Sequence, residues 1–311
     1  MCVVAVKYLK NFGWVGAKNR DRNYKTKIKV TQSNRYDVQR LYIDDQLSRW
    51  TEGINEYGIC IISASFSVKS DEKEGGKMLE RGNTNTEPTT KNRGTPGYYS
   101  PDGRAVRTAL LKKTPEAALR VLIDRELAGA TYVFNESECW LLEGGFTVKK
   151  GWSTKDNPRK YIYKTTRLNP QKISASTRTN HGIDLPMLGY KKDPTDEQLI
   201  RSRKSSETRH KYVCKFITAP MTDPSQLVDA LAKSPDKDTF MNPIRTGDPA
   251  KGEMVTTGQL LLVPKTRTLH YRPLYSAVEF EYDRLNLRNS KTYFEIISSR
   301  KLLSFTKFIN R

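Results

Sequence analysis

The chain has 311 residues, of which 36% are hydrophobic and 10% aromatic, so it can bury a substantial core in one large or two ordinary domains. No apolar run approaches the ~18 residues of a membrane span, and the chain does not begin with the basic and then apolar residues of a secretory signal, so we expect a cytoplasmic protein. The 54 Lys and Arg residues against 34 Asp and Glu give a net charge of +20, which favours anionic partners.

The charge is not accompanied by a recognisable nucleic-acid module, because the sequence has no sustained basic block and no zinc-finger spacing. Nucleic acid therefore stays open as a partner without a motif. The cysteines Cys2, Cys60, Cys139 and Cys214 form no CxxC pair, which indicates reduced thiols and not a disulfide framework. Three scattered histidines give no metal-binding spacing, and the glycine pairs give no phosphate loop, so we expect neither metal nor cofactor.

The first third of the chain predicts strands and one long insertion. Residues 3–8 are short, β-branched and apolar, and a turn at 11–13 joins them to an extended segment over 14–18, so this segment predicts a hairpin. Residues 59–66 are the most apolar run and predict a central strand. Residues 70–107 are rich in Gly, Asn, Thr, Pro and charge, which predicts an irregular insertion.

The remaining elements alternate between hairpins and helices. Thr114 and Pro115 have the composition of a helix N-terminus. We expect a helix over 114–127, a hairpin over 131–143, a strand over 161–165, helices from near 205 and over 223–233, a hairpin over 259–272 and a strand over 276–282. This order, without βαβ alternation, predicts an α+β fold with antiparallel sheets. The basic tail at 298–311 is either a solvated end or an arm that contacts anions.

Cys2 is the strongest chemical signal in the sequence. Once Met1 is removed, one residue carries both a thiol and the α-amine, whose pKa of roughly 7.7–8.0 lets it act as a base near neutral pH. Taken alone, a cysteine at position 2 is equally compatible with chance. Lys18, Asn19, Arg20 and Asp21 follow on the segment that returns beside it, where a cation would stabilise a thiolate and a carboxylate would orient the amine. The same residues also suit a polar turn.

These residues resemble the start of the cysteine N-terminal-nucleophile (Ntn) hydrolases. One similar branch is the choloylglycine hydrolases, with bile salt hydrolases, penicillin V acylases and acid amidase relatives. Another is the transport-and-Golgi-organisation family, whose Asn-Arg-Asp-Glu motif resembles residues 19–22, with Arg22 in place of Glu. Residues 55–61 (NEYGICI), 179–181 (TNH) and 205–209 (SSETR) resemble later motifs of the superfamily in the same order.

The resemblance implies one domain over residues 1–311, folded as a four-layer αββα sandwich of two antiparallel sheets flanked by helices. It implies that Cys2 is the nucleophile, that Asp21 orients the amine and that Asn180 donates to the oxyanion. Arg209 completes the polar network. Supporting or substrate-binding positions are Lys18 (where the hydrolases usually carry Arg), Asn19, Arg20 and Ser65 (where relatives carry Asn or Tyr).

The implied activity is hydrolysis of non-peptide linear amide bonds through a thioester at Cys2, on a small-molecule substrate. The same site becomes an acyltransferase if an amine replaces water. Arg20 and Arg22 near the nucleophile suggest an anionic substrate, although a generic basic surface explains them about as well. The alternative class is a catalytically silent basic protein of the same fold that binds nucleic acid.

Overall fold

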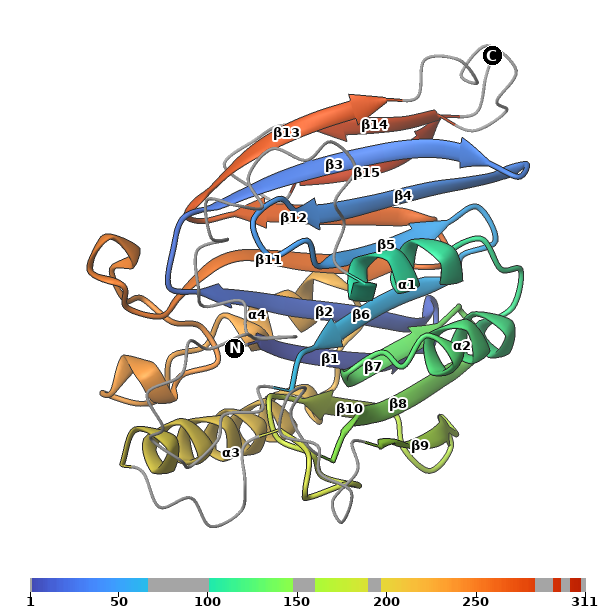
Figure 1. The fold of residues 1–311 in the computed structure, drawn as a ribbon. Helices are drawn as coiled ribbons and strands as arrows, with labels where there is room; N and C mark the ends of the chain where they lie inside the picture. The colour runs from blue at the N-terminus through green and yellow to red at the C-terminus, as the bar shows by residue number, and fades with distance from the viewer. Residues whose placement is uncertain are drawn as a thin grey trace.

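The computed structural model describes residues 2–66, 101–147, 160–189, 197–282, 293–297 and 303–308. In these residues the chain forms two β-sheets with helices packed against them (Figure 1). Neighbouring strands pair antiparallel except β13 and β3, which run parallel. The predicted α+β class with mostly antiparallel sheets is therefore confirmed.

The first sheet contains both strands of the predicted N-terminal hairpin. In pairing order, its strands in the described residues are β10 (Ala175–Arg178), β1 (Cys2–Leu9), β2 (Gly13–Arg22), β11 (Val255–Val263), β12 (Thr268–Pro273), β15 (Leu303–Phe308) and β14 (Tyr293–Ile297). The sequence-predicted hairpin is confirmed, but β2 continues through Asp21 to Arg22. The polar motif over 19–22 is thus part of a strand and not of a turn.

The second sheet has the predicted apolar segment in its interior. Its strands in pairing order are β13 (Ser276–Tyr282), β3 (Thr26–Arg35), β4 (Val38–Asp45), β5 (Thr51–Asn55), β6 (Cys60–Ala64), β7 (Gly129–Phe134), β8 (Cys139–Phe146) and β9 (Tyr161–Leu168). The predicted hairpin over 131–143 corresponds to β7 and β8. Strands β3 to β5 were not predicted from the sequence.

Four α-helices lie in the described residues: α1 (Pro101–Ala109), α2 (Pro115–Asp124), α3 (Glu197–Ile217) and α4 (Ser225–Leu231). Two short 3-10 helices follow, η2 (Thr239–Met241) and η3 (Pro249–Lys251). Helix α2 begins as predicted, because the Thr114 side chain accepts a hydrogen bond from the backbone N–H of Ala117.

Two helix predictions need correction. Residues 101–107, which we expected to be irregular, lie in α1, and the buried Ala105, Val106 and Ala109 give that helix an apolar side that its polar composition hides. The rest of the expected insertion, from 70 to 100, lies outside the described residues. Helix α3 begins at Glu197 and not near residue 205.

Side chains on β1 alternate between two hydrophobic clusters, as the pleat requires. Val4 and Val6 pack between the two sheets, in a cluster that includes Ile62 and Leu260. The intervening residues, such as Val3, face the other way and pack with α3 and α4. Helices α1 and α2 cover the opposite surface of the second sheet, as Figure 1 shows. Cys2 belongs to the inter-sheet cluster.

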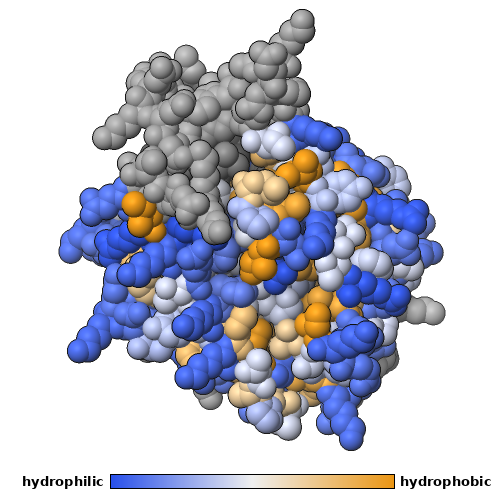
Figure 2. Space-filling model, turned by 90° about the horizontal axis from the view of Figure 1, so that it is seen from below, coloured by the Kyte–Doolittle hydropathy of each residue, from blue (hydrophilic) through white to orange (hydrophobic). Residues whose placement is uncertain are grey.

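On the face seen from below Figure 1, the described residues at the sides and bottom are mostly hydrophilic, and hydrophobic residues are interspersed toward the middle (Figure 2). Among the described residues, each helix is too short or too polar to cross a membrane. Part of the basic tail, β15, pairs with β12 and β14 and so belongs to the first sheet.

The two sheets approach closely at Gly16. A Cβ atom built there would lie 2.5 Å from the ring of Phe134 and 2.9 Å from Ile62. We therefore expect Gly16→Ala to lower the free energy of unfolding by about 1–3 kcal/mol, measured by urea denaturation, because the added methyl overpacks the inter-sheet core. Phe134→Leu should relieve the clash, so the double variant should lose less than the sum of the two single losses. Simple additivity would show that the contact is unimportant.

Candidate active site

Cys2 lies opposite three basic side chains of the neighbouring strand. In the register of β1 and β2, Cys2 pairs with Arg20. Lys18 and Arg22 lie two positions to either side of Arg20 and therefore point to the same face of the sheet. All four side chains enter the space between the sheets, where each is at most 3% exposed. The period of the strand thus places three cations around one thiol.

The second sheet supplies the counter-charges. Glu52 on β5 pairs with Lys18 and with Arg20, and Asp45 on β4 pairs with Arg20 (3.4 Å) and Arg22 (3.0 Å). Both carboxylates are fully buried. Burial alone would raise the pKa of the Asp45 carboxyl, but the charges of Arg22 and Arg20 hold that pKa below its usual value. We call Lys18, Arg20, Arg22, Asp45 and Glu52 the inter-sheet charge cluster.

The inter-sheet charge cluster has one positive charge in excess, and Cys2 is next to it. Three cations face two carboxylates, and Nη1 of Arg22 lies 3.5 Å from Sγ of Cys2. A buried cation without a counter-charge is costly, so an ionised thiol completes the balance. Burial alone would raise the pKa of the Cys2 thiol, but the charges of Lys18 and Arg22 outweigh burial and lower it to about 6.

The backbone nitrogen of Cys2 is held from the other side of the residue. It donates a hydrogen bond to Oδ1 of Asn180 (2.9 Å), and Nδ2 of Asn180 donates to the carbonyl oxygen of Ser65 (2.7 Å). The backbone N–H of Asn180 donates to Oγ of Ser206 on α3 (3.0 Å). Since a primary amide has two N–H donors, one donor of Asn180 Nδ2 remains beyond the bond to Ser65.

Asp21 faces the opposite side of the first sheet from the thiol. It forms a buried ion pair with Arg209 of α3 and accepts a hydrogen bond from the Thr256 hydroxyl (2.8 Å). Arg245 lies 3.9 Å from the same carboxylate. In α3, Ser206 and Arg209 lie three residues apart and so face the sheet together, which lets one helix hold both Asn180 and Asp21.

The structure thus brings Cys2, Lys18, Asn180 and Ser65 together and places Asp21 with Arg209 behind the sheet. Asn19 lies elsewhere: its Nδ2 donates to the carbonyl oxygens of Leu231 and Pro243, both at 2.8 Å, and so fastens the segment around α4. Arg20 is fully buried and paired with Glu52 and Asp45, so its charge is already matched inside the protein.

Sequence reasoning did not identify the partners of the site. Arg22 was noted as a departure from a motif, yet it is the cation that contacts the thiol. The signal that could have found it is the alternation of Lys18, Arg20 and Arg22, because every second residue of a strand shares a face. Asp45 and Glu52 could not be assigned without knowing how the sheets pack.

Glu143 and His181 support the loop that carries Asn180. The Glu143 carboxylate accepts from Nε of Arg178 (2.7 Å) and from the backbone N–H groups of residues 183–185. Nδ1 of His181 is 2.8 Å from Oγ of Ser206. Burial, followed by the charge of Arg203, lowers the pKa of His181 to about 3, so it is neutral near pH 7. Among the described residues, no cluster of His, Cys, Asp and Glu could hold a metal ion.

Comparison with protein-family models finds no match, and comparison with curated proteins finds none. Among solved structures, the chain is similar to a penicillin V acylase from Agrobacterium tumefaciens, with 13% identity and a TM-score of 0.42. The similarity covers 88% of this chain and 83% of the acylase chain.

The geometry predicts that the Cys2 thiol titrates with a pKa of about 6, so the thiolate fraction rises as the pH passes through that value. The ultraviolet absorbance of the thiolate, taken as the difference between wild type and Cys2→Ser, measures it. Arg22→Gln should move the midpoint upward by at least one pH unit or so, because it removes the contacting cation. Arg120→Gln, on the exposed surface of α2, should leave it unchanged. An unshifted midpoint in Arg22→Gln would contradict the assignment.

Proposed function

We propose that the protein is a cysteine Ntn amidohydrolase, which cleaves a non-peptide linear amide with Cys2 as its N-terminal nucleophile. The observation that carries the proposal is the position of Cys2, whose sulfur contacts Arg22 and whose nitrogen is hydrogen-bonded to Asn180. Removal of Met1 converts that nitrogen into an amine. One residue then presents a thiolate and a titrating amine to the same substrate.

The αββα sandwich of this superfamily and a single domain over residues 1–311 form part of the proposal. Three hydrophobic clusters support the layers: one between the sheets, one under α1 and α2, and one under α3 and α4. The early strands β1 and β2 pair with the late strands β11 and β12 in one sheet, and β13 joins β3 in the other. This interleaving of distant segments supports one folding unit.

The two pKa values define the resting state. With the thiol near 6 and an α-amine at roughly 7.7–8.0, the site at pH 7 holds a thiolate beside an ammonium. The thiolate therefore needs no base to become a nucleophile. The ammonium is available to protonate the leaving nitrogen, which is the step that amide cleavage requires.

The reaction then proceeds in two halves. The sulfur of Cys2 attacks the carbonyl carbon, the C–N bond breaks, and the ammonium gives its proton to the departing amine, which leaves a thioester and a neutral terminal amine. That amine next takes a proton from water, whose oxygen attacks the thioester. The C–S bond breaks, the carboxylic acid leaves, and the thiolate and ammonium are restored.

Asn180 is the proposed oxyanion donor. Its Oδ1 accepts from the nitrogen of Cys2, which fixes the orientation of the amide, and its Nδ2 keeps one donor beyond the bond to Ser65. In register, Asp21 lies one residue beyond the partner of Cys2, on the α3 face. We propose that Asp21 positions the amine and that Arg209 positions Asp21.

The charge of the substrate is not indicated by the arginines of the motif. Arg20 and Arg22 are matched by Glu52, Asp45 and the thiolate inside the protein. The preference for an anionic amide that the sequence suggested therefore has no support from these two residues.

Covalent labelling tests the nucleophile. Intact mass spectrometry of the purified protein should show loss of Met1 and a single adduct from a stoichiometric acyl chloromethyl ketone at pH 7, absent in Cys2→Ala. Cys214→Ser, which removes a half-buried thiol whose pKa is raised by burial, should retain the adduct. Retention of Met1, or labelling that persists in Cys2→Ala, would oppose the proposal.

Asn180 offers a test of the oxyanion role once a panel of N-acyl amides has given a substrate. Asn180→Ala should lower kcat by roughly 10²–10³-fold, as expected for one lost oxyanion donor. Asn180→Asp keeps an acceptor for the nitrogen of Cys2 but removes the N–H donor, so it should lose a similar factor. Recovery of near wild-type kcat in Asn180→Asp would assign Asn180 to holding Cys2 alone.

A further inference from the structure

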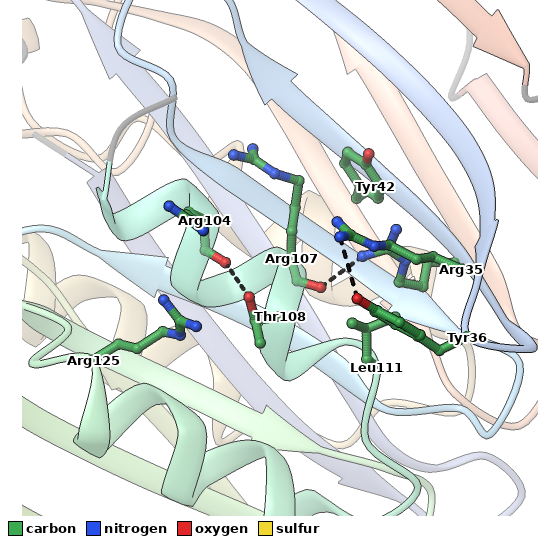
Figure 3. A pocket seen from close by; sticks show the side chains of 9 residues that line it. Arg35, Tyr36, Tyr42, Arg104, Arg107, Thr108, Leu111 and Arg125 are labelled. Atoms are coloured by element: carbon green, nitrogen blue, oxygen red, sulfur yellow. Dashed lines mark hydrogen bonds between the residues drawn. The ribbon is translucent and has the colours of Figure 1, made fainter. Parts of the chain in front are cut away.

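A cavity of about 620 Å³ lies on the surface of the second sheet that faces α1, away from the thiol. Its lining comes from the β3–β4 hairpin, strand β4, helix α1 and the end of α2 (Figure 3). On β4, Arg40 and Tyr42 point into this cavity, whereas the alternate residues Leu41 and Ile43 pack between the sheets. The cavity is therefore separated from Cys2 by the thickness of the sheet.

Positive charge dominates the cavity. The residues that line it include five arginines: Arg35, Arg40, Arg104, Arg107 and Arg125. Arg107 pairs with Asp44 at 2.8 Å. The other four form no ion pair with a carboxylate among the described residues. Figure 3 shows Arg104 and Arg107 on α1, Arg125 at the end of α2, and Arg35 beside Tyr36 on the other side.

Arg40 shows that the cavity is not merely a basic surface. Its side chain is 5% exposed, and its guanidinium donates to the carbonyl oxygen of Arg107 (2.7 Å) and to the Ser33 hydroxyl (2.8 Å). Among the described residues, Nε of Arg40 has no hydrogen-bond partner. Burial, with the charges of Arg35 and Arg107, lowers the pKa of Arg40 although Tyr42 and Asp44 act in the opposite direction, so an anion bound in the cavity would stabilise this cation.

Tyr36 projects at the tip of the β3–β4 hairpin. It is 74% exposed and has a φ of 53°, next to Asp37 with a φ of 58°. Both values lie in the left-handed region, which is unfavourable for a tyrosine and favours Asn or Gly in a hairpin turn. The exposed ring of Tyr36, despite this unfavourable backbone conformation, lies beside Arg35, whose guanidinium is 5.0 Å from the ring centroid.

We propose that this cavity binds a small ligand carrying two or more phosphate groups. Arginine forms paired hydrogen bonds to phosphate oxygens, and the four guanidinium groups that pair with no carboxylate in the described part of the chain call for a ligand with several negative charges in a small volume. The cavity size matches the usual range for small-molecule sites. A free polyphosphate and a nucleotide share this chemistry, and a nucleotide adds a base that can stack on Tyr36.

Calorimetric titration of the full chain with inorganic triphosphate and, separately, with ATP tests the proposal at near-physiological salt. Saturable binding with one site per chain is expected for at least one probe. The double variant Arg104→Gln, Arg125→Gln should weaken that binding by at least ~10-fold, since both side chains are exposed and their loss leaves the fold intact. Tyr36→Ser should weaken ATP and leave triphosphate unchanged if the ligand is a nucleotide, and change neither if it is a free polyphosphate.

A variant with the same change in net charge is the control. Arg120→Gln with Lys172→Gln removes two exposed positive charges outside the cavity, so it should bind both probes as the wild type does. If both double variants bound the probes equally weakly, the loss of binding would follow from net charge alone, and the proposal would be overturned. So would the absence of saturable binding for both probes. Cys2→Ala should bind normally, which separates this result from the fate of the proposed hydrolase.

Discussion

The inter-sheet charge cluster determines both how the two sheets pack and how the thiol of Cys2 is charged. Lys18, Arg20 and Arg22 leave β2 toward an otherwise hydrophobic layer, where unpaired cations would be costly. Glu52 and Asp45 from the second sheet offset two of the three charges. The thiolate of Cys2 offsets the third positive charge. The interactions that join the sheets therefore also keep the thiol ionised.

Residue 2 belongs to two networks because it lies on a strand. Its side chain enters the inter-sheet space and meets Arg22, whereas its nitrogen reaches Asn180. The same alternation explains the orientation of Asp21. Its neighbours on β2 point between the sheets, so the Asp21 side chain points the other way, toward α3. Helix α3 then controls the outer half of the site, because Ser206 holds Asn180 and Arg209 holds Asp21.

The sequence predicted the elements whose apolar pattern is clean, such as the β1–β2 hairpin, β6, α2 and the β11–β12 hairpin. In β4 and β5 the inward residues Asp45 and Glu52 are charged, which obscures the alternation that marks a strand. In β3, Ile28 and Val30 do alternate with lysines, so the sequence carried a strand signal there that was not used. The resemblance predicted Cys2, Asn180 and Asp21 as residues of the site. The counter-charges could not be found, because Glu52 is 34 residues from Lys18 and pairs with it only through sheet packing.

We propose that Cys2 attacks a carbonyl while Arg22 holds its sulfur and Asn180 holds its nitrogen. A crystal structure of the protein lacking Met1, with an acyl chloromethyl ketone bound, is the decisive test. We expect a covalent bond to Sγ of Cys2, Arg22 still adjacent to the sulfur, and the acyl oxygen within hydrogen-bonding distance of Asn180 Nδ2. An inhibitor bonded to another residue, or an acyl oxygen directed away from Asn180, would rule this mechanism out.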